Sequence, residues 1–124
     1  MGKCVLIVDD SSTMRKIVNR SLRQAGLVFD TVLEAGDGRE AMEILASQKP
    51  DIILSDVNMP NMDGIEFLKS KAQDPSIKDI PVVMITTEGG SQDMVGQSLS
   101  LGASGCVKKP FTPEQVNEVL GPLL

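Results

Sequence analysis

The sequence of 124 residues lacks histidine, tyrosine and tryptophan, and it has only two cysteines. Without histidine, the chain cannot form a phosphohistidine, use a histidine base or bind metal through imidazole. Polar chemistry must therefore use carboxylates, hydroxyls and lysine. Two cysteines could in principle pair, but Cys4 and Cys106 fall on separate predicted strands, and we expect both to be free, partly buried thiols in a reducing compartment.

Long apolar runs are also missing. The first run after the N-terminus has five residues and ends at Asp9, which is too short for the core of a signal peptide. No segment approaches the roughly 20 apolar residues of a membrane span. The net charge of −5 and the absence of a Lys/Arg cluster disfavour nucleic acid as a partner. We therefore expect a cytoplasmic protein with no membrane or nucleic-acid partner, folded as one domain over residues 1–124.

Short apolar runs alternate with segments of helical spacing along the chain. The runs predict five strands, at 5–8, 31–34, 52–56, 81–86 and 105–108. Helices are expected from Ser11–Ser12 to Gly26, from Asp37–Gly38 to a point before Pro50, after Gly64, from about 91 to 101, and from Thr112 onward. In the last helix, Thr112 is the expected N-cap, Pro113 the first helical residue and Gln115 the partner in a capping box.

Five strands alternating with five helices predict an α/β fold with a doubly wound parallel sheet. The strands are nearly continuous apolar runs, as is typical of strands covered on both faces. In such sheets, the carboxyl ends of the strands meet at one edge, where ligands bind. This edge should collect polar groups that are distant in sequence: Asp9, Asp10, Asp56, Thr86 and Lys109.

Three carboxylates in one crevice repel each other unless some are protonated or a cation lies among them. Oxygen donors without sulfur or imidazole suit Mg²⁺, which takes one or two carboxylates and phosphate oxygens. Lys109 adds a positive charge and Thr86 a hydroxyl. Together these groups match the requirements of phosphoryl transfer, with Asp56 as a carboxylate nucleophile.

Each of these residues also has a simpler interpretation. Asp9 and Asp10 could cap a helix, Asp56 could be a turn residue, and Lys109 could be a solvated charge before Pro110. Thr86 alone could be an ordinary strand residue. Their coincidence at one sheet edge favours the functional interpretation.

The motifs at this edge resemble one family as a set. Val8-Asp9-Asp10-Ser11-Ser12, Asp56 followed by the segment 58–64 (NMPNMDG), Ile85-Thr86 and Lys109-Pro110-Phe111 closely resemble the receiver domain of response regulators. The resemblance covers the whole chain, and segments 58–64 and 102–105 are most similar to CheY-like chemotaxis regulators. It implies a flavodoxin-like sheet with strand order 2-1-3-4-5.

The resemblance also implies roles. Asp56 would accept a phosphoryl group from a histidine kinase, and Asp10, Asp56 and the Asn58 carbonyl would bind Mg²⁺, with Asp9 holding a metal-bound water. Lys109 would contact the phosphoryl group, and Thr86 would be the switch hydroxyl. The domain would catalyse only its own phosphorylation and dephosphorylation, as a signalling switch and not an enzyme.

As a monomer, such a switch would bind a flagellar switch protein or a phosphatase through its fourth helix, fifth strand and fifth helix. The family places an aromatic ring on the fifth strand, where this chain has Cys106. A thiol cannot fill the same space, so coupling between Thr86 and a ring is not expected.

The sequence allows two alternative functions. The first is a stand-alone phosphorelay carrier or a phosphate sink, which would have the same site. The second is a flavodoxin-like cofactor carrier. Two acids after the first strand and only three phenylalanines for stacking disfavour a flavin site. A phosphatase of the Asp-x-Asp type is disfavoured because Asn58 replaces the second acid.

Overall fold

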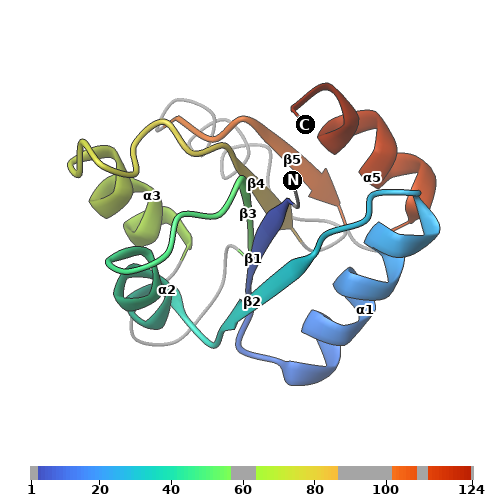
Figure 1. The fold of residues 1–124 in the computed structure, drawn as a ribbon, viewed down its shortest axis with the longest axis horizontal. Helices are drawn as coiled ribbons and strands as arrows, with labels where there is room; N and C mark the ends of the chain where they lie inside the picture. The colour runs from blue at the N-terminus through green and yellow to red at the C-terminus, as the bar shows by residue number, and fades with distance from the viewer. Residues whose placement is uncertain (1–2, 57–63, 87–101, 109–111, 124) are drawn as a thin grey trace.

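The computed structural model describes residues 3–56, 64–86, 102–108 and 112–123 (Figure 1). Within them, five parallel strands form one sheet in the order β2-β1-β3-β4-β5, which confirms the expected fold and strand order. The strands are β1 (Cys4–Val8), β2 (Thr31–Ala35), β3 (Ile52–Asp56), β4 (Val82–Thr86) and β5 (Gly105–Lys108). Strand β4 begins one residue later than predicted, because Pro81 has no N–H to donate, although its carbonyl accepts from the Ile53 amide at 2.9 Å.

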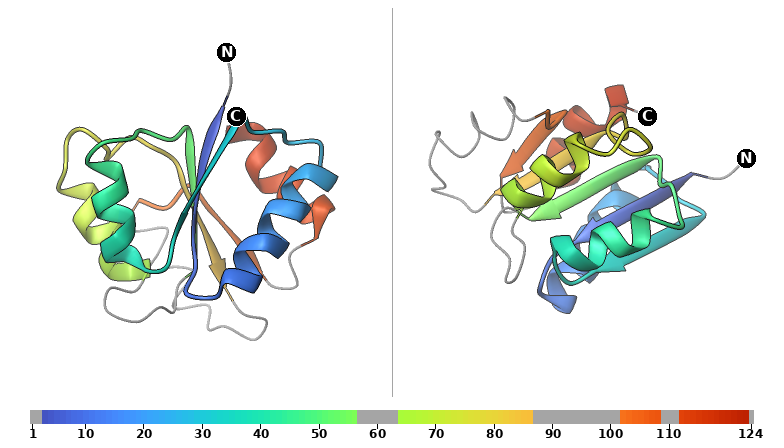
Figure 2. Two further views of the ribbon diagram at one scale, coloured as in Figure 1. Left: turned by 60° about the horizontal axis from the view of Figure 1, so that its bottom comes forward. Right: turned by 90° about the vertical axis from the view of Figure 1, so that its left-hand side faces the viewer.

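Helices cover both faces of the sheet (Figure 2). Helices α2 (Gly38–Leu45) and α3 (Gly64–Ala72) lie on one face. Helices α1 (Ser12–Gln24) and α5 (Pro113–Leu120) lie on the other, and a short 3₁₀ helix, η1 (Gly121–Leu123), follows α5. The helix expected at about 91–101 lies outside the described residues.

Alternation along the strands divides the core into two apolar clusters. In β1, Leu6 and Val8 point to the cluster under α2 and α3, whereas Val5 and Ile7 point to the cluster under α1 and α5. Phe67 of α3 is completely buried in the first cluster. Strand β2 lies at the sheet edge and is more exposed than β1 or β3.

The helix ends follow local sequence signals. Ser11, Asp37 and Thr112 are N-caps whose side chains accept hydrogen bonds from backbone amides three residues later. Helix α1 ends in a Schellman motif: Gly26 has φ +82°, its N–H bonds to the Arg23 carbonyl, and the Leu27 N–H bonds to the Leu22 carbonyl, both at 3.0 Å.

The capping box predicted for α5 is only half formed in the described part of the chain. The Thr112 hydroxyl oxygen accepts from the Gln115 amide at 3.3 Å. The reciprocal bond from the Gln115 side chain is missing, because its buried Oε1 meets no donor among the described residues. Thr112 therefore caps the helix alone. Both cysteines are free and partly buried, as predicted.

Candidate metal and phosphorylation site

Asp9 and Asp56 lie at the carboxyl ends of two neighbouring strands. Val8 of β1 is in register with Ser55 of β3, so the aspartates that follow them, Asp9 and Asp56, lie beside each other at the carboxyl end of the sheet. Asp56 is the last residue of β3, and Asp9 follows the last residue of β1. Strand order and register therefore bring together two acids that are 47 positions apart in the sequence.

Burial and hydrogen bonds fix Asp9. Its side chain is 1% exposed. Its backbone N–H donates to the Ala35 carbonyl of β2 at 3.0 Å, and its carboxylate oxygen Oδ1 accepts from the Ser11 amide at 2.9 Å. Asp56 is 6% exposed, whereas Asp10 is exposed. Two acids of the site are thus shielded from water and the third faces it.

The carboxylates of Asp9, Asp10 and Asp56 form one cluster. Each offers one oxygen, and these oxygens all lie within 4.8 Å of one another. Opposite ligands of an octahedral Mg²⁺ ion, with metal–oxygen distances of about 2.1 Å, lie about 4.2 Å apart. The donor set contains only hard oxygen ligands, which is what Mg²⁺ prefers. The residues therefore fit a magnesium ion held by one or two carboxylates and by water.

Arg15 of α1 contacts the backbone of the turn between β1 and α1, which carries Asp9 and Asp10. Its Nη1 donates to the main-chain carbonyl of Asp9 at 2.5 Å, and its Nε donates to Oε1 of Glu34, at the end of β2, at 2.9 Å. The Arg15 side chain is 18% exposed. Sequence reasoning missed this bridge. The place of Arg15, one helical turn after Ser11, hints at a contact with the turn, but no local pattern links it to Glu34, 19 residues away.

The other predicted site residues are placed only in part. Thr86 ends β4, where its backbone is in register with Lys108 of β5, so it lies at the same sheet edge as the acids. Nothing further is described for its side chain. Asn58 and Lys109 lie outside the described residues.

Cys106 occupies the position at which the family resemblance implies an aromatic ring. It is opposite Met84 of β4, and it packs against the apolar cluster under α2 and α3. Burial raises the pKa of its thiol above the usual value. Cys106 therefore acts here as a small apolar side chain.

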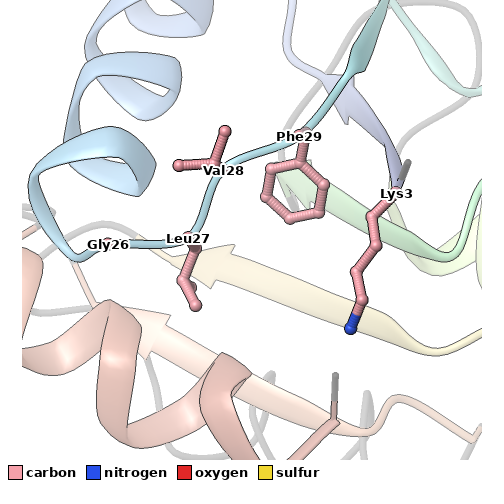
Figure 3. A pocket seen from close by; sticks show the side chains of 5 residues that line it. All are labelled: Lys3, Gly26, Leu27, Val28 and Phe29. Atoms are coloured by element: carbon pink, nitrogen blue, oxygen red, sulfur yellow. The ribbon is translucent and has the colours of Figure 1, made fainter. Parts of the chain in front are cut away.

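Two hollows in the described structure lie away from the acids. One, of about 210 Å³, is lined by Lys3, Leu27 and Phe29 among others, and lies at the amino ends of β1 and β2 (Figure 3). The other, of about 250 Å³, lies between the last turn of α3 and Gly102. Neither contains a residue of the acidic cluster. No described helix is both long enough and apolar enough to cross a membrane.

Comparison with known proteins agrees with this geometry. Residues 5–120 match the family described as the response regulator receiver domain. The chain belongs to this family. It is 42% identical to the chemotaxis protein CheY1 of Helicobacter pylori over 117 residues, which cover 94% of this chain and 92% of that protein.

Two further similarities support the assignment. The chain is 39% identical to a CheY homologue of Campylobacter jejuni, over 97% of this chain and 91% of that one. It superposes on the structure of the chemotaxis response regulator CheY4 of Vibrio cholerae with a TM-score of 0.84 and 37% identity, with all of both chains covered. The fold and the receiver family are therefore established together.

Proposed function

We propose that this receiver domain is a phospho-acceptor switch of a two-component system, and that Asp56 receives the phosphoryl group. The observation that supports this best is the cluster of Asp9, Asp10 and Asp56, whose oxygens lie within 4.8 Å of one another at the carboxyl edge of the sheet. A carboxylate oxygen of Asp56 attacks the phosphorus of a phosphohistidine in the partner kinase. The phosphorus–nitrogen bond breaks, and the released imidazole takes up a proton.

Mg²⁺, held by Asp10 and Asp56 with Asp9 oriented toward a bound water, would neutralise the phosphoryl oxygens in this pocket. The residues of the chain hold the carboxylates of the site in place. Asp56 is fixed at the end of a buried strand, and the Ser11 amide and Ala35 carbonyl hold Asp9. Lys109 and Thr86 would contact the phosphoryl oxygens. In this proposal the domain acts only on itself, gaining and later losing the phosphoryl group.

The output we propose is control of flagellar rotation in chemotaxis, within the cytosol. Relatives at 39–42% identity over nearly the whole chain are named as chemotaxis proteins, which favours this role over that of a relay carrier or phosphate sink. The phosphorylated chain would bind a flagellar switch protein through α5, β5 and the segment before β5. A binding assay with a flagellar switch protein and with a histidine phosphotransfer protein separates the two roles.

The acceptor is tested by incubating the chain with acetyl phosphate and Mg²⁺. Intact-mass spectrometry should show the addition of one phosphoryl group to the wild type and none to Asp56→Asn. Asp51→Asn is a matched control, because this aspartate precedes the same strand at its opposite end. Labelling of Asp56→Asn at the wild-type level would disprove the assignment.

A further inference from the structure

Arg15 makes two hydrogen bonds that tie the acidic turn to a neighbouring strand. Its guanidinium donates to the Asp9 carbonyl through Nη1 and to the Glu34 carboxylate through Nε. Three elements therefore meet at one side chain: the end of β1, the first turn of α1 and the end of β2. No other described arginine makes such a bridge.

The bond to the Asp9 carbonyl affects two acids of the cluster. This carbonyl belongs to the peptide unit that joins Asp9 to Asp10, and a peptide unit is planar. The plane contains the Cα atoms of both aspartates, so a hydrogen bond to its oxygen restricts the rotation of the unit to which both side chains are attached. The Ala35 carbonyl and the Ser11 amide hold Asp9 at its backbone N–H and its Oδ1. Arg15 adds the constraint on the side of Asp10, the exposed acid.

The positive charge of Arg15 by itself would weaken the binding of Mg²⁺ to the acidic cluster. A positive charge next to a cation site repels the cation and lowers its affinity. The Glu34 carboxylate, 2.9 Å from Nε, offsets this charge. What the pair then contributes is geometry, because the guanidinium has a rigid fork of donors that reaches both acceptors at once.

We propose that Arg15, paired with Glu34, is a positioning residue that raises the Mg²⁺ affinity of the acidic cluster by fixing the Asp9–Asp10 peptide. This inference rests on the proposed function. Outer-shell partners of metal ligands typically change metal affinity by about 10- to 100-fold when they are removed. Because Arg15 acts on the backbone and not on a ligand atom, we expect a loss of about 10-fold.

The test measures Mg²⁺ affinity of the full chain by calorimetric titration, without a phosphodonor. Arg15→Met and Arg15→Lys should both bind Mg²⁺ about 10-fold more weakly than the wild type, since neither has the fork. Arg20→Met, the same change at an exposed position of α1, should stay within about twofold of the wild type. Tighter binding by Arg15→Met, or wild-type binding by Arg15→Lys, would show that charge and not geometry acts here.

The salt dependence of Mg²⁺ affinity separates the charge of Arg15 from its geometry. Glu34→Gln leaves the Arg15 charge without its partner, so its Mg²⁺ affinity relative to the wild type should fall at low ionic strength and recover at high ionic strength. The deficit of Arg15→Met should persist in salt, because a lost constraint is not screened. An Arg15→Met deficit that disappears in salt would contradict the proposal.

Phosphorylation by acetyl phosphate separates positioning from general damage. Raising Mg²⁺ should restore the labelling rate of Arg15→Met to the wild-type maximum, because only metal binding is weakened. A maximum that stays low at saturating Mg²⁺ would overturn the inference. Failure of the wild type to bind Mg²⁺ would instead overturn the proposed function. Wild-type binding with an unchanged Arg15→Met overturns this inference alone.

Discussion

Gly105 of β5 lies directly against Val119 of α5. A Cβ atom added to Gly105 would lie 2.9 Å from Cγ1 of Val119, closer than real Cβ atoms approach such a group. The absence of a side chain at Gly105 thus sets how closely α5 packs on the edge strand of the sheet. Valine is branched at Cβ and cannot move away by a simple rotation.

Gly105→Ala should therefore destabilise the protein. Overpacking of this kind typically costs about 1–3 kcal/mol. Urea unfolding followed by circular dichroism measures the change, since the chain has no tryptophan or tyrosine to report by fluorescence. Val119→Ala on its own creates space, and the double variant should recover part of the stability lost in Gly105→Ala. If the stability changes of the two single variants simply add in the double variant, the methyl group introduced at position 105 does not contact Val119.

Replacing an acid of the cluster should have opposite effects on metal binding and on stability. Asp10→Asn removes a charged ligand, and we expect Mg²⁺ affinity to fall by at least about 10-fold. The same change relieves repulsion, which amounts to about 1 kcal/mol for two charges 4 Å apart in water, so the unfolding free energy without metal should rise. Calorimetric titration and urea unfolding measure the two effects.

Asp9→Asn provides the matched case in the buried part of the cluster. The asparagine oxygen can still accept from the Ser11 amide, so the turn should be kept while the charge is lost. Phosphorylation by acetyl phosphate should slow in both variants. Fast labelling of the wild type without any divalent ion would show that the cluster does not work through a metal.

Lys71 of α3 should make stability depend on alkaline pH. Its side chain is 4% exposed, and its Nζ donates to the Lys78 carbonyl at 2.9 Å. Burial lowers the pKa of this ammonium, and the Asp79 carboxylate opposes that shift. The folded protein therefore releases this proton at a lower pH than the unfolded chain, so stability rises as the pH increases through the folded pKa toward about 10.5.

The comparison is with Lys71→Met, which cannot titrate. Between pH 7 and pH 10, the unfolding free energy of the wild type should rise relative to that of Lys71→Met. Asp79→Asn should move the rise to lower pH, because it removes the group that opposes the shift. If the unfolding free energies of the wild type and Lys71→Met change in parallel with pH, Lys71 does not cause the expected rise in stability.

The signal should run from Thr86 to the segment that follows it. Gly89, Gly90 and Gly96 give residues 87–101 low helix propensity, and a switch requires an element with two arrangements of similar energy. With Mg²⁺ and beryllofluoride, a phosphoryl mimic, hydrogen exchange should change most across 87–101. Thr86→Ala should remove the change, and Cys106→Ala should leave it intact. A response confined to α5 would refute this route.

Much of the fold follows from local pattern. Apolar runs placed all five strands, and Ser11, Asp37 and Thr112 marked three helix starts, because cap chemistry depends on a few adjacent residues. The side chain of Gln115 does not complete its capping box, since the choice between a cap and a buried position depends on the surrounding packing.

The site was predictable as a gathering of acids, because parallel strands share one carboxyl edge. The bridge from Arg15 to Glu34 was not, because it depends on how far β2 extends beside β1 and on one rotamer. The close approach of Gly105 to Val119 likewise arises from packing between two elements, which a single sequence does not encode as a pattern.

Strands β1 and β3, which end in the acids, are interior strands of the sheet, flanked by β2 on one side and β4 on the other. Local opening events begin at edges and termini, where fewer contacts must be broken. A molecule that has transiently released α5 and β5 would thus still hold Asp9 and Asp56 side by side. We expect the capacity to accept a phosphoryl group to outlast the capacity to present an intact α5 to a partner. On mild heating, binding of a partner through α5 should therefore be lost at a lower temperature than phosphorylation of Asp56.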